Sequence, residues 1–132
     1  MDRKKEGSLF THIVVGANDL IAAKQFYDQA LGALGYEPGA AMGDRVIYAT
    51  GSGILMVTKP IDGNPACYGN GITIGLSAPD VAAVDAFHAK GLAAGGSDGG
   101  APGPRDAIPN SYAAYVRDPT GNKLVAWCVA GG

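Results

Sequence analysis

The chain has 132 residues, a hydrophobic content of 47% and a formal net charge of −2. A chain of this length is normally one domain with a substantial core, and this composition argues against disorder over the whole chain. Basic residues cluster only at Arg3, Lys4 and Lys5. The charge pattern therefore excludes nucleic acid and acidic membrane surfaces as expected partners.

The N-terminal stretch MDRKKEG is charged, and no apolar signal core follows it. Residues 1–7 are expected to form a disordered leader, and no apolar run approaches the ~18 residues of a membrane span. We therefore expect a cytoplasmic protein. Cys67 and Cys128 lack CxxC spacing, which argues against a disulfide framework and a four-cysteine zinc site.

The first half of the chain predicts a strand, a helix and then further strands. A β-branched run precedes the segment "AND", whose Asp19 is a candidate helix N-cap. Apolar residues recur from Leu20 to Leu34 at steps of three and four, and Gly32 and Gly35 are predicted to stop this helix. The predicted strands are residues 10–15, 35–41 (weakly marked), 45–49 and 54–58.

The second half predicts the same order of elements. Asp80 in "APD" is a candidate N-cap, His88 lies on the helix that follows, and Gly91 is predicted to end that helix. The turn "RDPTGN" contains Asp118, which is expected to close a hairpin rather than to bind a ligand. The predicted strands are residues 72–77, 95–100 (weakly marked), 112–116 and 123–129.

An internal repeat links the two halves when they are compared at a spacing of 61 residues, the distance from His12 to Thr73. The fold class predicted from this repeat is α+β, with two βαβββ modules that form a paired, curved mixed sheet around a cleft. One domain is expected over residues 8–130, with the first module at about 8–60, a linker at 61–70 and the second module at about 71–130. The matching pairs are His12 with Thr73, Ile13 with Ile74, Asp19 with Asp80, Ala22 with Ala83, Phe26 with Phe87, Leu31 with Leu92, and Gly35 with Gly96.

A glycine-rich stretch, "GGSDGGAPGP", covers residues 95–104. It lacks GK[ST] and no clear helix follows it, so a phosphate-binding loop is not expected. A mobile loop over the cleft is expected instead. Arg105 at the end of this loop is expected to be solvated, with an anion clamp as the alternative.

Two longer segments resemble a known family. "FTHIVVGANDLIAAKQFYDQALGALGY" resembles the opening of the vicinal oxygen chelate superfamily, which includes glyoxalase I, extradiol dioxygenases and bleomycin-resistance proteins. "YAAYVRDPTGNKLVAW" is similar to the closing hairpin of that family. The resemblance covers roughly residues 9–128 and implies a glyoxalase-like fold. It does not imply one function, since this scaffold supports both binding and several chemistries.

The resemblance also implies where a metal ion would bind in metal-dependent members. The corresponding positions here are His12, Met56, Thr73 and Val125. A divalent cation requires several hard or borderline ligands, and only His12 is a good one. No metal or other cofactor is therefore expected, although a divalent metal in a rebuilt site remains the alternative.

His12 itself is expected to be a strand histidine that is hydrogen-bonded inside the barrel. Ligand binding or proton transfer, and metal binding, are the alternatives. The sequence contains no GxSxG motif, and neither cysteine has a local catalytic signature. No catalytic residue is assigned.

The expected site is a cleft that is mostly apolar and has a few hydrogen-bonding groups, a composition typical of small-ligand pockets. The leading hypothesis is a binder of a small organic molecule that needs no metal. The alternatives are a metal-dependent lyase resembling lactoylglutathione lyase or a dioxygenase with a rebuilt metal site, and a relative retained for an interaction surface. A homodimer is implied by the resemblance. The candidate pocket residues are His12, Tyr48, Met56, Thr73, Tyr115, Val125 and Trp127.

Overall fold

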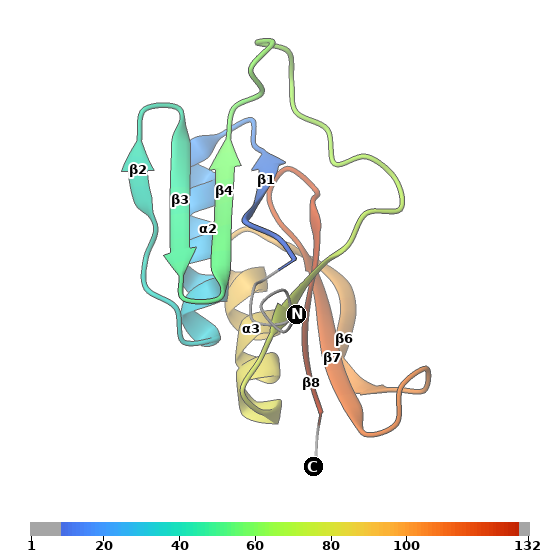
Figure 1. Cartoon of the computed structure of the whole chain (residues 1–132). Helices are drawn as coiled ribbons and strands as arrows, with labels where there is room; N and C mark the ends of the chain where they lie inside the picture. The colour runs from blue at the N-terminus through green and yellow to red at the C-terminus, as the bar shows by residue number, and fades with distance from the viewer. Residues whose placement is uncertain (1–8, 130–132) are drawn as a thin grey trace.

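The computed structural model describes residues 9–129, so the predicted leader at 1–7 lies outside the described residues. Within that range the chain forms two βαβββ modules (Figure 1). The first contains β1 (His12–Gly16), α2 (Leu20–Ala33), β2 (Ala40–Met42), β3 (Arg45–Thr50) and β4 (Gly53–Thr58). The second contains β5 (Ile74–Ser77), α3 (Val81–Ala93), β6 (Ser97–Arg105), β7 (Ser111–Arg117) and β8 (Lys123–Val129).

Each module builds a four-stranded mixed sheet with the same topology. The strand orders are β1-β4-β3-β2 and β5-β8-β7-β6. In both sheets the first and last strands of the module pair in parallel, and the other neighbours pair antiparallel. The predicted α+β class and the module repeat are therefore confirmed, and the two sheets stay separate instead of closing into one barrel.

The two helices begin in the same way. The side chains of Asp19 and Asp80 accept hydrogen bonds from the backbone N–H groups of Ala22 and Ala83, at 3.0 and 2.8 Å. These bonds satisfy donors that have no partner within the helix. The predicted N-caps, which are 61 residues apart, are thus both confirmed.

The helix ends agree with the prediction at Gly35 and differ from it at Gly32 and Gly91. Gly32 and Gly91 lie inside α2 and α3 and do not stop them. The residues just beyond the two C-caps are Gly35 and Gly95, with φ of 101° and 103°, a left-handed conformation that favours glycine. The spacing between equivalent residues of the two modules therefore falls by one residue across the second helix. Gly95, and not Gly96, is the counterpart of Gly35.

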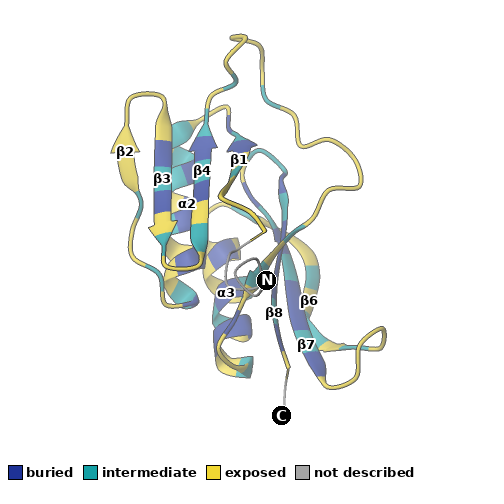
Figure 2. Ribbon diagram, viewed as in Figure 1, coloured by how far each residue is buried: buried dark blue, intermediate teal, exposed yellow. Residues whose placement is uncertain are grey.

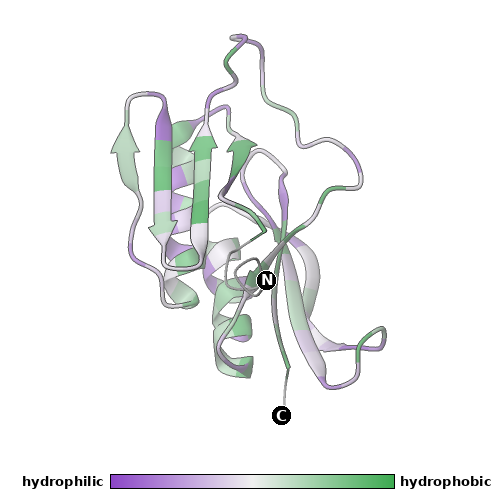
Figure 3. Ribbon diagram, in the orientation of Figure 1, coloured by the Kyte–Doolittle hydropathy of each residue, from purple (hydrophilic) through white to green (hydrophobic). Residues whose placement is uncertain are grey.

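The core lies between the helices and one face of each sheet (Figure 2). Phe26 and Phe87, one from each helix, are both fully buried there. Alternate strand residues such as Val46, Val57 and Leu124 point into this core, as expected from the two-residue period of a strand. Figure 3 shows β3 and β4 as mostly hydrophobic.

The glycine-rich stretch at 95–104 is not a mobile loop over the cleft, so that prediction is wrong. Most of it belongs to β6, which pairs antiparallel with β7 at the edge of the second sheet. The register shifts between Asp98 and Gly100 and again between Gly100 and Gly103. These irregularities bend the strand, which explains why a regular strand pattern was absent from the sequence.

The modules contact each other through helices and through turns. Helix α2 packs against α3. The Asn122 side chain donates a hydrogen bond of 3.0 Å to the Gly16 carbonyl of the other module. Strands β1 and β5 are edge strands of separate sheets, and residues of both line the same pockets; we call the boundary between these two strands the seam. No helix of the described residues is long and apolar enough to cross a membrane.

Asp118 closes the β7–β8 hairpin, as predicted. One of its carboxylate oxygens accepts hydrogen bonds from the backbone N–H groups of Thr120, Gly121 and Asn122, each at 2.9 Å. The other accepts from the Tyr27 hydroxyl at 2.6 Å and from the Asn122 side chain at 2.8 Å. The turn of the second module is thereby bonded to α2 of the first.

Candidate functional site

A pocket of about 270 Å³, here called the seam pocket, opens at one end of the seam. It is formed by the start of β1, the β3–β4 turn, β5 and the segment that follows α2. The volume is near the lower end of the ~300–1,000 Å³ that is common for small-molecule sites. Its walls are mainly apolar and include Ile13, Leu31, Ile54, Leu55, Ile74 and Leu76.

Three polar groups of the seam pocket are free to bind a ligand. The hydroxyl groups of Tyr36 and Ser77 make no hydrogen bond with any described residue, and both residues line the pocket. The ring of His12 is exposed, with Nδ1 2.9 Å from the Thr11 hydroxyl and Nε2 unpartnered. The expectation that His12 is hydrogen-bonded in the interior of a barrel is therefore wrong, because β1 is an edge strand beside the open seam.

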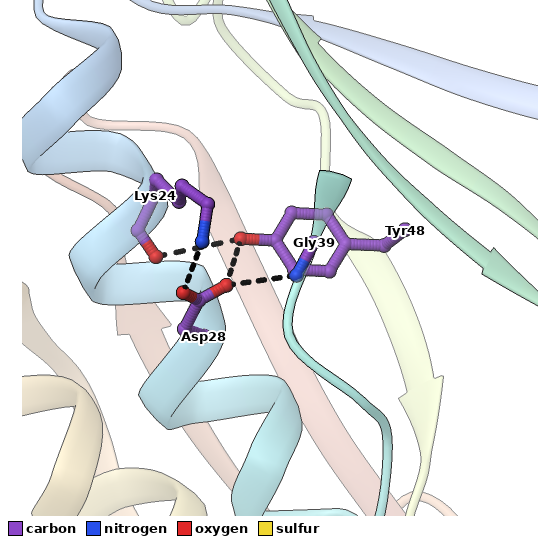
Figure 4. A network of polar contacts seen from close by, with 4 residues as sticks. All are labelled: Lys24, Asp28, Gly39 and Tyr48. Carbon is purple, nitrogen blue, oxygen red and sulfur yellow. Dashed lines mark hydrogen bonds and ion pairs between the residues drawn. The ribbon is translucent and has the colours of Figure 1, made fainter. Parts of the chain in front are cut away.

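Tyr48 reaches the seam pocket from the core side of β3. Its hydroxyl donates a hydrogen bond of 2.7 Å to Asp28, which also binds the Lys24 ammonium at 2.7 Å and the Gly39 N–H at 3.0 Å (Figure 4). Burial, and then the hydrogen bond and charge of Asp28, raise the pKa of Tyr48 well above its ordinary value. The phenol is therefore a fixed hydrogen-bond donor within this network, and its ring serves as a wall of the pocket.

The same network holds the Asp28 carboxylate in its charged form. Burial by itself raises the pKa of Asp28, but the hydrogen bonds from Lys24, Gly39 and Tyr48 outweigh this effect and lower the pKa below its ordinary value. The carboxylate thus fixes α2, the segment before β2, and β3 relative to one another. This contact sets the position of the wall that Tyr48 supplies.

The other predicted pocket residues are not brought to the seam pocket. They lie on or beside the sheet faces that point away from the helices, as the alternation along β4, β7 and β8 requires. Of the seven candidates, the structure therefore places His12 and Tyr48 together at this pocket. Those outside it are Met56, Thr73, Tyr115, Val125 and Trp127.

The four positions that the family resemblance assigns to metal ligands do not form a suitable donor set. In the two parallel strand pairs, Val14 lies opposite Met56 and Gly75 lies opposite Val125. His12 lies two residues before Val14, and Thr73 lies two residues before Gly75, so the two halves of the donor set occupy equivalent positions in the two modules. These positions offer one imidazole, one thioether, one hydroxyl and one alkyl group, and an alkyl group cannot bind a cation. Among residues 9–129 there is also no cluster of three or more His, Cys, Asp or Glu side chains suited to a metal.

Sequence reasoning missed Tyr36 and Ser77. Ser77 is two residues beyond Gly75 and shares its face of β5, so strand alternation was the available signal. Tyr36 follows the first helix outside any regular element, and no motif marks it. Its position depends on how α2 ends, for which the sequence offered both Gly32 and Gly35.

Comparisons with known proteins agree with this architecture. The family model of the Glyoxalase/Bleomycin resistance protein/Dioxygenase superfamily matches residues 9–126. A crystal structure of a glyoxalase/bleomycin resistance protein from Albidiferax ferrireducens is 47% identical, with a TM-score of 0.85, and the match covers 91% of this chain and 98% of that one. No curated protein matches the chain.

Two more distant structures share the fold alone. A lactoylglutathione lyase from Agrobacterium tumefaciens is 24% identical, with a TM-score of 0.65 and 95% coverage of each chain. A glyoxalase-related enzyme from Fulvimarina pelagi is 18% identical, with a TM-score of 0.72, covering 89% of this chain and 86% of that one. From the family model and the 47% identical relative, we conclude that this chain belongs to the glyoxalase/bleomycin resistance protein/dioxygenase superfamily.

Proposed function

We propose that this protein binds a small, largely apolar organic molecule in the seam pocket and does so without a metal ion. The observation that carries this proposal is the composition of the pocket, which combines apolar walls with the free polar groups of His12, Tyr36 and Ser77. An apolar pocket with a few fixed polar groups binds by burial and selects by hydrogen bonding. A metal ion is not part of the proposal, because the donor set at the family positions does not suit one.

The first experiment measures metal content and metal affinity. Protein purified without a chelator or an affinity tag is analysed for bound metal and then titrated anaerobically with Ni(II), Zn(II), Mn(II) and Fe(II). We expect the purified protein to hold less than one equivalent of metal. We also expect the titrations to show no saturable metal site that depends on His12, so His12→Ala should give the same curves. Tightly held metal at one equivalent, abolished by His12→Ala, would contradict the proposal and favour a lyase or dioxygenase with a rebuilt site.

The second experiment locates the ligand. Neutral fragments, beginning with indole and phenol, are titrated into ¹⁵N-labelled protein, and we expect amide shifts at Gly53, Gly75 and Ser77. Gly75→Leu is the blocking variant, because a Cβ there meets only Val125 at 3.7 Å while the residue lines the pocket. Gly32→Leu, on the exposed side of α2 with nothing within 4 Å of its Cβ, is the matched control.

We expect Gly75→Leu to weaken fragment binding at least about tenfold, since the new side chain occupies space that the ligand needs. Gly32→Leu is expected to leave the affinity unchanged. Equal affinity in the two variants, or shifts confined to residues away from the seam, would rule out the seam pocket as the binding site.

A further inference from the structure

The outward face of the second sheet carries a row of cations and tyrosine rings. The Arg105 guanidinium lies 5.6 Å from the centre of the Tyr115 ring, and the Lys123 ammonium lies 4.9 Å from the same centre. Arg117 lies 5.2 Å from the ring of Tyr68 in the linker. Arg117 and Lys123 are direct partners across β7 and β8, so the contacts form one continuous row, here called the cation–tyrosine row.

The glycines of β6 make room for this arrangement. A Cβ at Gly100 would lie 3.2 Å from the Tyr115 ring and 3.5 Å from the Arg105 guanidinium, and one at Gly103 would lie 3.5 Å from that guanidinium. The Arg105 side chain folds back along the strand and donates a hydrogen bond of 2.8 Å to the Ala101 carbonyl. The glycine-rich stretch thus lets Arg105 lie flat against the sheet beside Tyr115, and does not hold it out in solvent.

The charges of the row are not neutralised by carboxylates. The ion pairs found within residues 9–129 are Lys24–Asp28 and His88–Asp98, and neither involves the row. Arg117 and Lys123 are like charges at directly opposed positions, an arrangement that costs stability unless an anion screens it. The Lys123 ammonium has no hydrogen bond to any described residue, so all its donors are available.

An apolar pocket of about 280 Å³, here called the linker pocket, lies beside this row at the other end of the seam. Among residues 9–129, Lys123 is the only charged residue that lines the linker pocket. Both Lys123 and Tyr68 belong to the linker pocket and to the cation–tyrosine row. The remaining walls are mainly aliphatic, from β1, the linker and β5, and include Val14, Val15, Ile72 and Ile74. A cation at the rim of an aliphatic pocket suits an organic anion better than an inorganic one.

We propose that the cation–tyrosine row and the linker pocket together bind a small organic carboxylate. The carboxylate contacts Lys123, with Arg105 and Arg117 on either side, and the apolar part of the molecule enters the linker pocket. Arg105 and Arg117 are already held by hydrogen bonds to backbone carbonyls, so little side-chain freedom is lost on binding. This site shares the walls Ile13 and Ile74 with the seam pocket, but its charged and aromatic groups are different ones, and it goes beyond the function proposed above.

The test compares benzoate with benzamide, a neutral molecule of nearly the same shape. Each is titrated into ¹⁵N-labelled protein at low ionic strength, where charge interactions are least screened. We expect benzoate to shift the amides of Val116, Lys123 and Leu124 and to bind at least about tenfold more tightly than benzamide. These shifts are distinct from those at Gly53, Gly75 and Ser77, so failure here and failure of the seam-pocket proposal can be told apart.

Two matched variants identify the charge responsible. Lys123→Gln removes the rim cation and is expected to weaken benzoate binding about tenfold. Lys59→Gln removes an equivalent charge from an exposed lysine beyond the end of β4 and is expected to have no effect. The melting temperature of each variant confirms that both remain folded.

Several results would overturn the proposal. These are equal binding of benzoate and benzamide, an unchanged benzoate affinity in Lys123→Gln, and benzoate shifts that map to the seam pocket. Inorganic phosphate binding as tightly as benzoate would show that the apolar pocket plays no part. Polyglutamate binding to the row in the absence of benzoate binding would identify a surface for an acidic protein instead.

Discussion

Asp118 has far more contacts than its place in a turn motif suggests. The sequence predicted its turn role from "RDPTGN", because aspartate at this place accepts hydrogen bonds from the backbone that follows it. Its bond to the Tyr27 hydroxyl joins residues 91 positions apart, and no local pattern contains that information. Burial, and then the charge and hydrogen bond of Asp118, raise the pKa of Tyr27 well above its ordinary value.

Replacing Asp118 with asparagine is expected to lower the free energy of unfolding by about 3 kcal/mol. The side chain is 3% exposed, and the new amide NH₂ group would face the Tyr27 hydroxyl and the Asn122 amide or the backbone N–H groups of the turn, all of which are donors. Urea denaturation monitored by circular dichroism measures the change. Asp106→Asn, an exposed carboxylate in the β6–β7 loop, serves as the control and is expected to be neutral. Equal midpoints for the two variants would disprove the role assigned to Asp118.

Of the pocket residues predicted from the sequence, some reach the seam pocket and others do not. His12 and Tyr48 were both predicted as pocket residues, and both reach the seam pocket. Tyr115, Val125 and Trp127 were grouped with them on the assumption that the sheets enclose one common cleft. The sheets instead remain separate, and these three residues lie on faces that point away from the helices, outside the seam pocket.

At the level of elements, the repeat identified helices, most strands and both N-caps. These features depend on local hydrogen bonds and on the periodic burial of side chains. The residue types and spacings that produce both can be read from the sequence. For the segment that forms β6, the sequence predicted only a weakly marked strand at 95–100 and favoured a loop over 95–104, because its glycines and prolines are typical of irregular structure. Its pairing with β7 depends on a distant segment and on bulges, which local preference does not reveal.

Glycines within or near helices have different roles that a substitution can separate. A methyl group at Gly96 would lie 2.5 Å from Phe26 and 2.8 Å from the Arg117 carbonyl oxygen, whereas one at Gly32 would meet nothing within 4 Å. We expect Gly96→Ala to destabilise the protein by about 3 kcal/mol, because backbone atoms must move. Gly32→Ala should stabilise it by about 0.5–1 kcal/mol through helix propensity.

Thermal and urea unfolding of both glycine variants provide the measurement. If Gly96→Ala lowers the free energy of unfolding and Gly32→Ala raises it, the chain just after α3 is in close contact with both the core and β7, whereas Gly32 on α2 has open space around it. A Gly96→Ala variant as stable as the parent protein would mean that α2, α3 and β7 do not approach one another closely at Gly96.

At the level of the whole molecule, the two modules share contacts that neither retains alone. Helix α2 packs on α3, the Tyr27 hydroxyl binds Asp118, and the Asn122 side chain binds the Gly16 carbonyl. The two pockets also draw walls from both modules. Folding and ligand binding are therefore expected to require both modules together. The sequence repeat alone would suggest that each module is a complete folding unit.

A core substitution in the first module tests this coupling, because Trp127 in the second module is the only tryptophan of the chain. Val57 is fully buried in β4, and Val57→Ala is expected to cost about 2 kcal/mol. If the modules unfold as one unit, the midpoints from Trp127 fluorescence and from circular dichroism shift together. Val129→Ala, an exposed site on β8, should shift neither. A shift in circular dichroism without a change in Trp127 fluorescence would show that the modules unfold independently, and the seam would then be a weak contact rather than a fixed site.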